Sequence, residues 1–104
     1  MVITDIKVLI RDDLRLKAYV AITIDDCFIV RDIRIIQGDE GLFVAMPSRK
    51  RPNGRFRDVA HPLNAHTRKL IEEKVLKAYQ SAKDDGAAPL AGDDEGDQTY
   101  GGYL

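Results

Sequence analysis

The first 46 residues contain the feature that most constrains the fold, four apolar runs separated by short polar turns. Residues 2–11 alternate apolar and polar side chains with the two-residue period of a β-strand. The alternation continues in residues 16–24 and in residues 27–36, where β-branched residues are frequent. A short fourth run, residues 42–46, ends at Pro47. Because only short turns separate these runs, they predict neighbouring antiparallel strands.

A helix is expected near the C-terminal end of the domain. Within residues 65–83, apolar side chains recur at helical spacing, at Leu70, Ile71, Val75, Leu76 and Tyr79. Asn64 is placed to cap this helix by accepting a hydrogen bond from the amide of Thr67. Residues 56–60 are long enough for a short fifth strand. The sequence therefore predicts an α+β fold: an antiparallel β-sheet meander of four to five strands with one packed C-terminal α-helix.

The charges are segregated along the chain. Residues 84–104 carry six acidic residues and no basic one, whereas residues 1–83 carry 16 basic and 11 acidic residues, a net charge of +5. The acidic segment is rich in glycine and aspartate and has too few apolar residues to offset its ordering entropy. We therefore expect a domain at 1–83 followed by a disordered acidic tail at 84–104.

Positive charge is densest between residues 49 and 57, where five of nine positions are basic and none is acidic: Arg49, Lys50, Arg51, Arg55 and Arg57. Such a loop either contacts a polyanion or remains a solvated surface. In the first case its cations would contact phosphates, which position a nucleic acid without specifying its sequence. Phe56 could then stack on an unpaired base. Its alternation with two arginines in a strand-like segment favours a place in the core instead.

The apolar content of the strands predicts a homodimer. Ile3 and Leu9 in the first run, and Ile29, Ile33 and Ile35 in the third, place apolar side chains on both faces of the sheet. One helix cannot cover both faces. A second copy of the chain would bury the surplus apolar surface or pair with a sheet edge.

The remaining polar residues do not form a catalytic set. Asp58, His61 and His66 are close in sequence but lack the ligand spacing of a metal site. Cys27 opens an apolar run and is expected in the core, and a single cysteine cannot form an internal disulfide. We find no long apolar segment and no leader sequence. The sequence thus predicts a cytoplasmic protein that is not an enzyme, with no cofactor, no small-molecule substrate and no membrane association.

The segment GLFVAMPSRKRPNGRFRDVAHPLN at residues 41–64, preceded by FIVRDIRIIQG, resembles the stage V sporulation protein G (SpoVG) family. The resemblance covers roughly residues 1–80, and its core is LFVAMPS followed by FRDVAHP. It implies a homodimeric bacterial regulator that binds DNA and RNA and influences sporulation, division septum formation or gene expression. It also implies nucleic-acid contacts at basic positions after the LFVAMPS motif and on the helix, here Arg49, Lys50 and Arg51, and Arg68 and Lys69.

The chain departs from the family pattern in ways that add positive charge. Arg51 and Arg55 occupy positions where a neutral and an acidic residue are expected, and Asn53 replaces an aspartate. On the helix, Lys74 and Lys77 could extend the basic surface or form an ordinary solvated face. Two alternatives remain open at this point. The basic loop could dock an acidic protein, which would make the chain an adaptor in division or sporulation, and the acidic tail could compete with nucleic acid for the loop.

Overall fold

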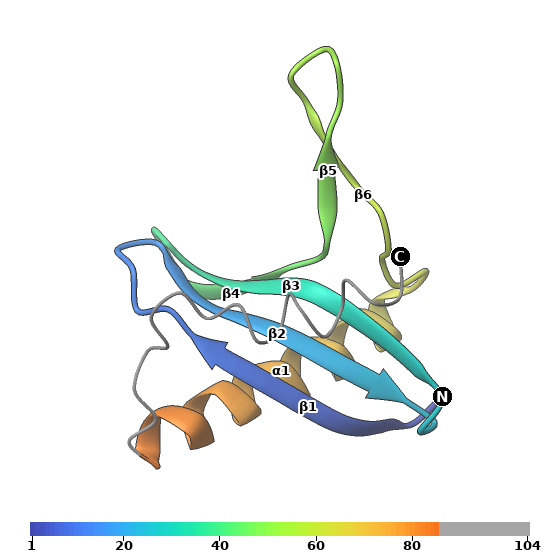
Figure 1. The fold of residues 1–104 in the computed structure, drawn as a ribbon, viewed down its shortest axis with the longest axis vertical. Coiled ribbons are helices and arrows are strands. Elements are labelled where there is room, and N and C mark those ends of the chain that lie inside the picture. Colours follow the sequence, from blue (N-terminus) through green and yellow to red (C-terminus); the bar gives the residue numbers. More distant parts are fainter. Residues whose placement is uncertain (86–104) are drawn as a thin grey trace.

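The computed structural model describes residues 1–85 as a four-stranded antiparallel sheet, one helix and a separate two-stranded hairpin (Figure 1). The strands of the main sheet lie in the order of the sequence and are β1 (Ile3–Ile10), β2 (Leu16–Ile24), β3 (Phe28–Gly38) and β4 (Gly41–Ala45). The α+β meander predicted from the alternation is therefore confirmed. Residues 86–104, most of the expected acidic tail, lie outside the described residues.

One face of the main sheet forms the core. The strand register aligns Ile10 with Ala18, Ala18 with Ile35, and Ile35 with Val44, and all four side chains are buried. The helix α1 (Ala65–Asp84) lies against this face and contributes the buried residues Ile71, Val75 and Tyr79. The burial of each such aliphatic side chain stabilises the fold by roughly 1.5–3 kcal/mol. The apolar side chains that recur every two residues in the strands therefore pack against those that recur every three to four residues in the helix.

The ends of α1 are set by local hydrogen bonds. The side-chain oxygen of Asn64 accepts a hydrogen bond of 2.8 Å from the Thr67 amide, which confirms the predicted cap. The helix continues through Asp84, one residue beyond the expected end, and the amide of Asp85 donates to the carbonyl of Ser81 at 2.9 Å. Lys83 lies in the last turn, where a positive charge interacts favourably with the helix dipole. Within residues 1–85, no helix is long and apolar enough to cross a membrane.

The opposite face of the main sheet is not covered by α1. Alternation places Leu9, Tyr19, Ile36 and Phe43 on this helix-free face, and each of them is partly exposed to solvent. The prediction for Cys27 was wrong, because this residue lies in the turn before β3 and is exposed rather than buried. The register pairs Ile24 with Phe28, which leaves Cys27 in the turn that connects the two strands.

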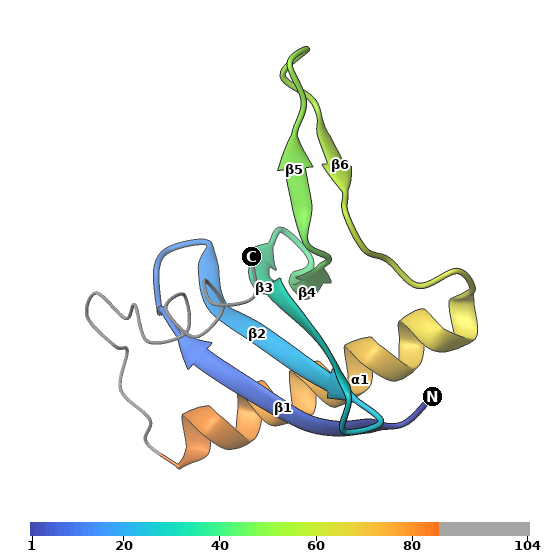
Figure 2. The same cartoon turned by 45° about the vertical axis from the view of Figure 1, so that its right-hand side comes forward.

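The segment between β4 and α1 forms a second small sheet. Its strands are β5 (Ser48–Lys50) and β6 (Phe56–Asp58), which among the described strands pair only with each other. This element, residues 48–58, is called the basic hairpin below. It stands away from the main sheet in both views (Figures 1 and 2). The expected fifth strand at residues 56–60 is present but ends at Asp58, and it pairs with a strand that the sequence had indicated only as a loop.

Candidate nucleic-acid interface

The tip of the basic hairpin is a tight turn built from Arg51 to Arg55. The Gly54 amide donates to the Arg51 carbonyl at 2.9 Å, and the Arg51 amide donates to the Arg55 carbonyl at 2.7 Å. The Asn53 side chain accepts a third hydrogen bond, of 2.9 Å, from the Arg55 amide. Pro52 is suited to the first turn position, and Gly54 has a φ of 86°, which favours glycine.

The pairing of β5 with β6 sorts the side chains onto two faces. Arg49 lies opposite Arg57, and Lys50 lies opposite Phe56. Cross-strand partners share a face and successive pairs alternate between faces. One face therefore carries the Arg49–Arg57 pair, and the other carries Lys50 with Phe56. All five predicted cations of the segment are exposed, and the structure brings them together on this one element: Arg49, Lys50, Arg51, Arg55 and Arg57.

The electrostatics of this arrangement are unfavourable for the isolated chain. Like charges directly opposite each other on a two-stranded ladder are destabilising, and Arg49 and Arg57 are such a pair. Within residues 1–85, none of the five cations makes an ion pair with a carboxylate. Asp58 is at the base of the hairpin, where it lies opposite Ser48 rather than an arginine. The hairpin thus presents five cations and a single carboxylate, and that carboxylate is not paired with any of the five in the described residues.

Two contacts hold the base of the basic hairpin to the rest of the molecule. The Val59 amide donates to the Pro47 carbonyl at 2.7 Å, which closes the base below the strands. The Arg34 guanidinium donates to the Ser48 hydroxyl at 3.2 Å and links β3 to β5. The sequence did not indicate this contact of Arg34, because its nearest charged neighbour along the strand is Asp32 and Ser48 lies 14 residues away.

The prediction that Phe56 belongs to the core was wrong. Its side chain is 68% exposed. Alternation indicates a buried face only where another layer covers the strand, and nothing in the described chain packs on either face of the basic hairpin (Figure 2). Val59, just beyond β6, is equally exposed at 68%. The aromatic ring therefore lies on the surface, next to the hairpin cations.

The two helix residues implied by the family resemblance are separate from the hairpin. Lys69 is exposed, and Arg68 is half-exposed with its Nη1 3.9 Å from Glu72 Oε2. Both are near the start of α1, and residues 59–64 span the distance between them and β6 (Figure 2). Within one chain, the seven predicted site residues therefore form one cluster of five and a second group of two.

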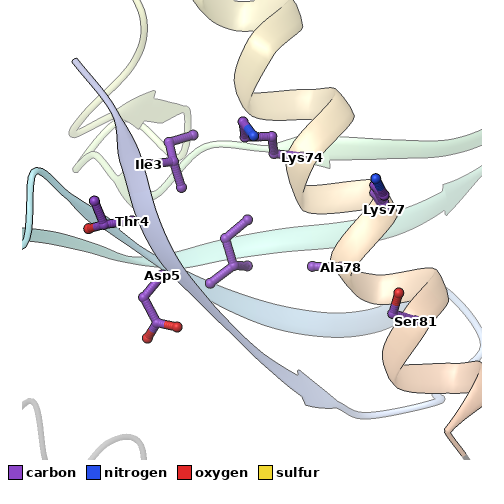
Figure 3. Close-up of a pocket in the computed structure, with 8 residues that line it drawn as sticks. Ile3, Thr4, Asp5, Lys74, Lys77, Ala78 and Ser81 are labelled. Carbon is purple, nitrogen blue, oxygen red and sulfur yellow. The ribbon is translucent and has the colours of Figure 1, made fainter.

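Lys74 and Lys77 lie still further along α1. They line a hollow between α1 and β1 together with Asp5 and Ser81, and the hollow is open to solvent (Figure 3). This position separates them from the basic hairpin. Elsewhere in the described part of the chain, no group of three or more histidine, cysteine or acidic side chains is placed to hold a metal ion. His61 contacts a backbone oxygen instead, with its Nδ1 3.0 Å from the Pro62 carbonyl.

Comparison with known proteins connects this architecture to a family. The SpoVG family model matches residues 1–81. A protein of Bdellovibrio bacteriovorus is 58% identical over 80 residues, covering 77% of this chain and 74% of the relative. A protein of Acholeplasma laidlawii is 55% identical over 85 residues, covering 81% and 90% of the two chains. Both relatives carry the name "Putative septation protein SpoVG". The matched region contains every described strand and nearly all of α1, so the chain belongs to the SpoVG family.

Proposed function

We propose that this protein is a homodimeric bacterial regulator that binds DNA and RNA through the basic hairpin, with Arg68 and Lys69 as secondary contacts. The observation that carries the proposal is the Arg49–Arg57 pair, two like charges held opposite each other without a carboxylate partner in the described residues. A phosphate between the two guanidinium groups would turn this repulsion into attraction on both sides. The names of the relatives further support septation as the process that the regulator influences.

The shape of the basic hairpin suits a nucleic acid. A two-stranded β-ribbon is narrow enough to enter the major groove of B-DNA, and its exposed arginines can also follow a single strand. Each lysine or arginine that contacts a phosphate releases condensed counterions, so binding should weaken steeply with salt. Because phosphate contacts carry little sequence information, selectivity requires additional contacts with bases.

A homodimer would bury the apolar residues on the helix-free face and would carry two basic hairpins. The helix-free face retains the partly exposed Leu9, Ile36 and Phe43, which a second copy would cover. Two hairpins on one dimer would also raise the effective concentration of the second hairpin once the first is bound. Both consequences favour a dimer over a monomer as the binding form.

The proposal is tested by fluorescence anisotropy with labelled single- and double-stranded DNA and RNA across a range of salt concentrations. The wild type should bind all four probes at low salt, with a slope of about 0.9 per phosphate contact on B-DNA. A variant with glutamine at the five hairpin cations should lose most of this affinity. The matched control replaces five exposed cations elsewhere, Lys7, Arg15, Lys74, Lys77 and Lys83, and so removes the same net charge.

The control separates a local site from a general effect of charge. If both variants lose affinity equally, the basic hairpin is not the site. If the folded wild-type protein binds no nucleic acid at low salt, the proposed function is wrong. The hairpin would then be better explained as a dock for an acidic protein, which is the role of an adaptor in division or sporulation.

A further inference from the structure

Phe56 is the feature of the basic hairpin that phosphate binding does not explain. Its side chain is 68% exposed on a strand that pairs with β5 alone. Exposure of a phenyl ring to water is unfavourable, and a cation or small polar residue would serve phosphate contact better at this position. Phosphate contact therefore does not account for the ring, which is available to bind a different group.

The surroundings of the ring indicate what kind of ligand fits. Phe56 lies directly opposite Lys50, and the neighbouring pair on the same face is Ser48 with Asp58. Arg55 and Arg57 precede and follow it in the chain, and both are exposed. Protein-docking surfaces concentrate apolar side chains and are depleted of lysine and aspartate at their centre. A lone aromatic ring among cations is instead typical of a surface on which nucleic-acid bases stack.

The nearby apolar residue Val59 does not change this conclusion. Its amide donates to the Pro47 carbonyl at the base of the hairpin, one residue beyond the end of β6. Within the paired strands β5 and β6, Phe56 is therefore the one apolar side chain. The pairing with Lys50 also fixes the position of Phe56 on the hairpin, where 68% of the residue is exposed.

Resting on the function proposed above, we propose that the Lys50–Phe56 face of the basic hairpin binds an unpaired nucleobase and gives the protein a preference for single-stranded nucleic acid. The base stacks on the Phe56 ring. Lys50, which lies opposite Phe56 on the same face, contacts a flanking phosphate. In a duplex both faces of each base are already stacked on neighbours, so the ring gains a partner only after costly unstacking.

The first experiment compares Phe56→Leu with Phe56→Tyr in the full-length protein. Leucine keeps an apolar side chain but removes the aromatic face, whereas tyrosine keeps it. Phe56→Leu should weaken binding to a single-stranded oligothymidine or oligouridine by about 5- to 140-fold, the range expected when one stacked base is removed. Affinity for a DNA duplex should stay unchanged, and Phe56→Tyr should bind like the wild type. Val59→Ala, at an equally exposed position, is the matched control and should bind normally.

A second experiment detects stacking directly. The chain contains no tryptophan, so Phe56→Trp introduces a single fluorescent reporter at the site. Its emission should be quenched by the single-stranded probe and much less by the duplex at matched occupancy. Equal quenching by both probes would overturn the proposal.

The outcomes separate this inference from the function on which it rests. If the wild type binds neither probe, the proposed function itself fails. If the wild type binds and the hairpin arginines carry that binding, but Phe56→Leu has no effect, only the stacking inference is wrong. If Phe56→Leu lowers single-strand and duplex affinity equally while sedimentation shows a shift toward monomer, Phe56 is a dimer contact and not a base-stacking residue.

Discussion

Arg49 and Arg57 lie opposite each other on one face of the basic hairpin, and within residues 1–85 neither has a carboxylate partner. Interactions that stabilise a fold normally place opposite charges, or apolar groups, at such cross-strand positions. The pair therefore opposes hairpin formation slightly and is favourable only when an anion is present. At the scale of single residues, the contribution of this pair to binding and its contribution to folding have opposite signs.

This opposition predicts the behaviour of Arg57→Gln. Removal of one charge relieves the repulsion, so the hairpin should become more stable by about 0.2–1 kcal/mol. Binding should weaken to a similar degree for all nucleic-acid sequences, and the salt slope should fall by about 0.9 for each phosphate that the variant no longer neutralises. Anisotropy across salt measures the binding, and hydrogen exchange at the Arg51 amide, which bonds to Arg55 within the hairpin, measures the stability of the hairpin. Lys77→Gln, far from the hairpin, is the control; a decrease in the stability of Arg57→Gln would contradict the argument.

At the scale of elements, the basic hairpin is stabilised by its own turn and by contacts at its base. Three hydrogen bonds close the turn from Arg51 to Arg55, and the Arg34–Ser48 and Val59–Pro47 contacts hold the base. No side chain from residues 49–59 is buried. The shape of the hairpin consequently depends on backbone geometry at a few positions rather than on packing.

Gly54→Ala tests this dependence. Alanine has room for its side chain but is strained at a φ of 86°, at a cost of about 1–2 kcal/mol. The turn should open more often while the melting temperature of the domain stays nearly constant. Hydrogen exchange at the Arg51 amide should accelerate, and affinity for nucleic acid should fall. Gly54→Asn, which tolerates a positive φ, should behave more like the wild type; a large drop in melting temperature for Gly54→Ala would show that the hairpin is coupled to the core.

The helix offers a contrasting prediction, because its capping supports the core. Asn64→Ala removes the acceptor of the 2.8 Å hydrogen bond from the Thr67 amide. The free energy of unfolding should decrease by roughly 1 kcal/mol. Urea denaturation measures this change, and Asn64→Ser, which keeps a capping oxygen, should retain most of the stability. An unchanged midpoint for Asn64→Ala would mean that solvent replaces the cap without cost.

The sequence predicted the elements whose apolar residues recur regularly over many positions. It failed to predict burial where no second element covers the strand. Four strands and the capped helix follow from alternation and helical spacing that repeat over many residues. Strand β5 has three residues, too few for a periodic signal, whereas β6 was expected as part of residues 56–60. Alternation also wrongly placed Phe56 in the core, because no element of residues 1–85 packs against the hairpin. Conversely, Ile33 and Ile35, which were counted as surplus apolar surface, are fully buried in the core of the single chain. The five hairpin cations could be grouped from sequence, but their separation from Arg68 and Lys69 depends on the path of residues 59–64.

At the scale of the whole molecule, an acidic C-terminal segment follows a basic body. Residues 86–104 carry four acidic side chains, those of Asp93, Asp94, Glu95 and Asp97, and no cation. A covalently attached anion competes with nucleic acid at a high effective concentration. The proposed binding surface would then discriminate against weak, non-specific ligands, whose few phosphate contacts cannot displace the acidic segment.

Removal of residues 86–104 should therefore tighten non-specific binding at low salt. Truncation after Asp85 is preferable to a cut after Lys83, because Asp84 belongs to α1 and the Asp85 amide caps it. The gain should shrink as ionic strength approaches physiological values, where the Debye length is about 8 Å. A full-length variant with amides in place of the four acidic side chains should show the same gain in affinity, because it removes the charge but keeps the length of the segment. Unchanged affinity in both variants, measured by anisotropy, would rule out competition.

The proposed dimer makes a separate prediction. Phe43, 46% exposed on the helix-free face, should lie at the contact between protomers. Phe43→Glu should shift the protein from dimer to monomer in sedimentation velocity, because a buried unpaired carboxylate is costly. Leu14→Glu provides a control at an 89% exposed position in the turn between β1 and β2. A wild type that sediments as a monomer at micromolar concentration would contradict the dimer.

The separation of the basic hairpin from the core has a consequence for how such proteins diversify. Most substitutions in a packed core reduce stability, and selection removes those that fall below the threshold for folding. Residues 49–55, between the family motifs LFVAMPS and FRDVAHP, are free of that constraint, since none of their side chains is buried. New ligand preferences can therefore arise there by mutation while the sheet and α1 stay intact. The same independence makes the hairpin a natural segment to exchange between relatives when engineering altered binding on a constant scaffold.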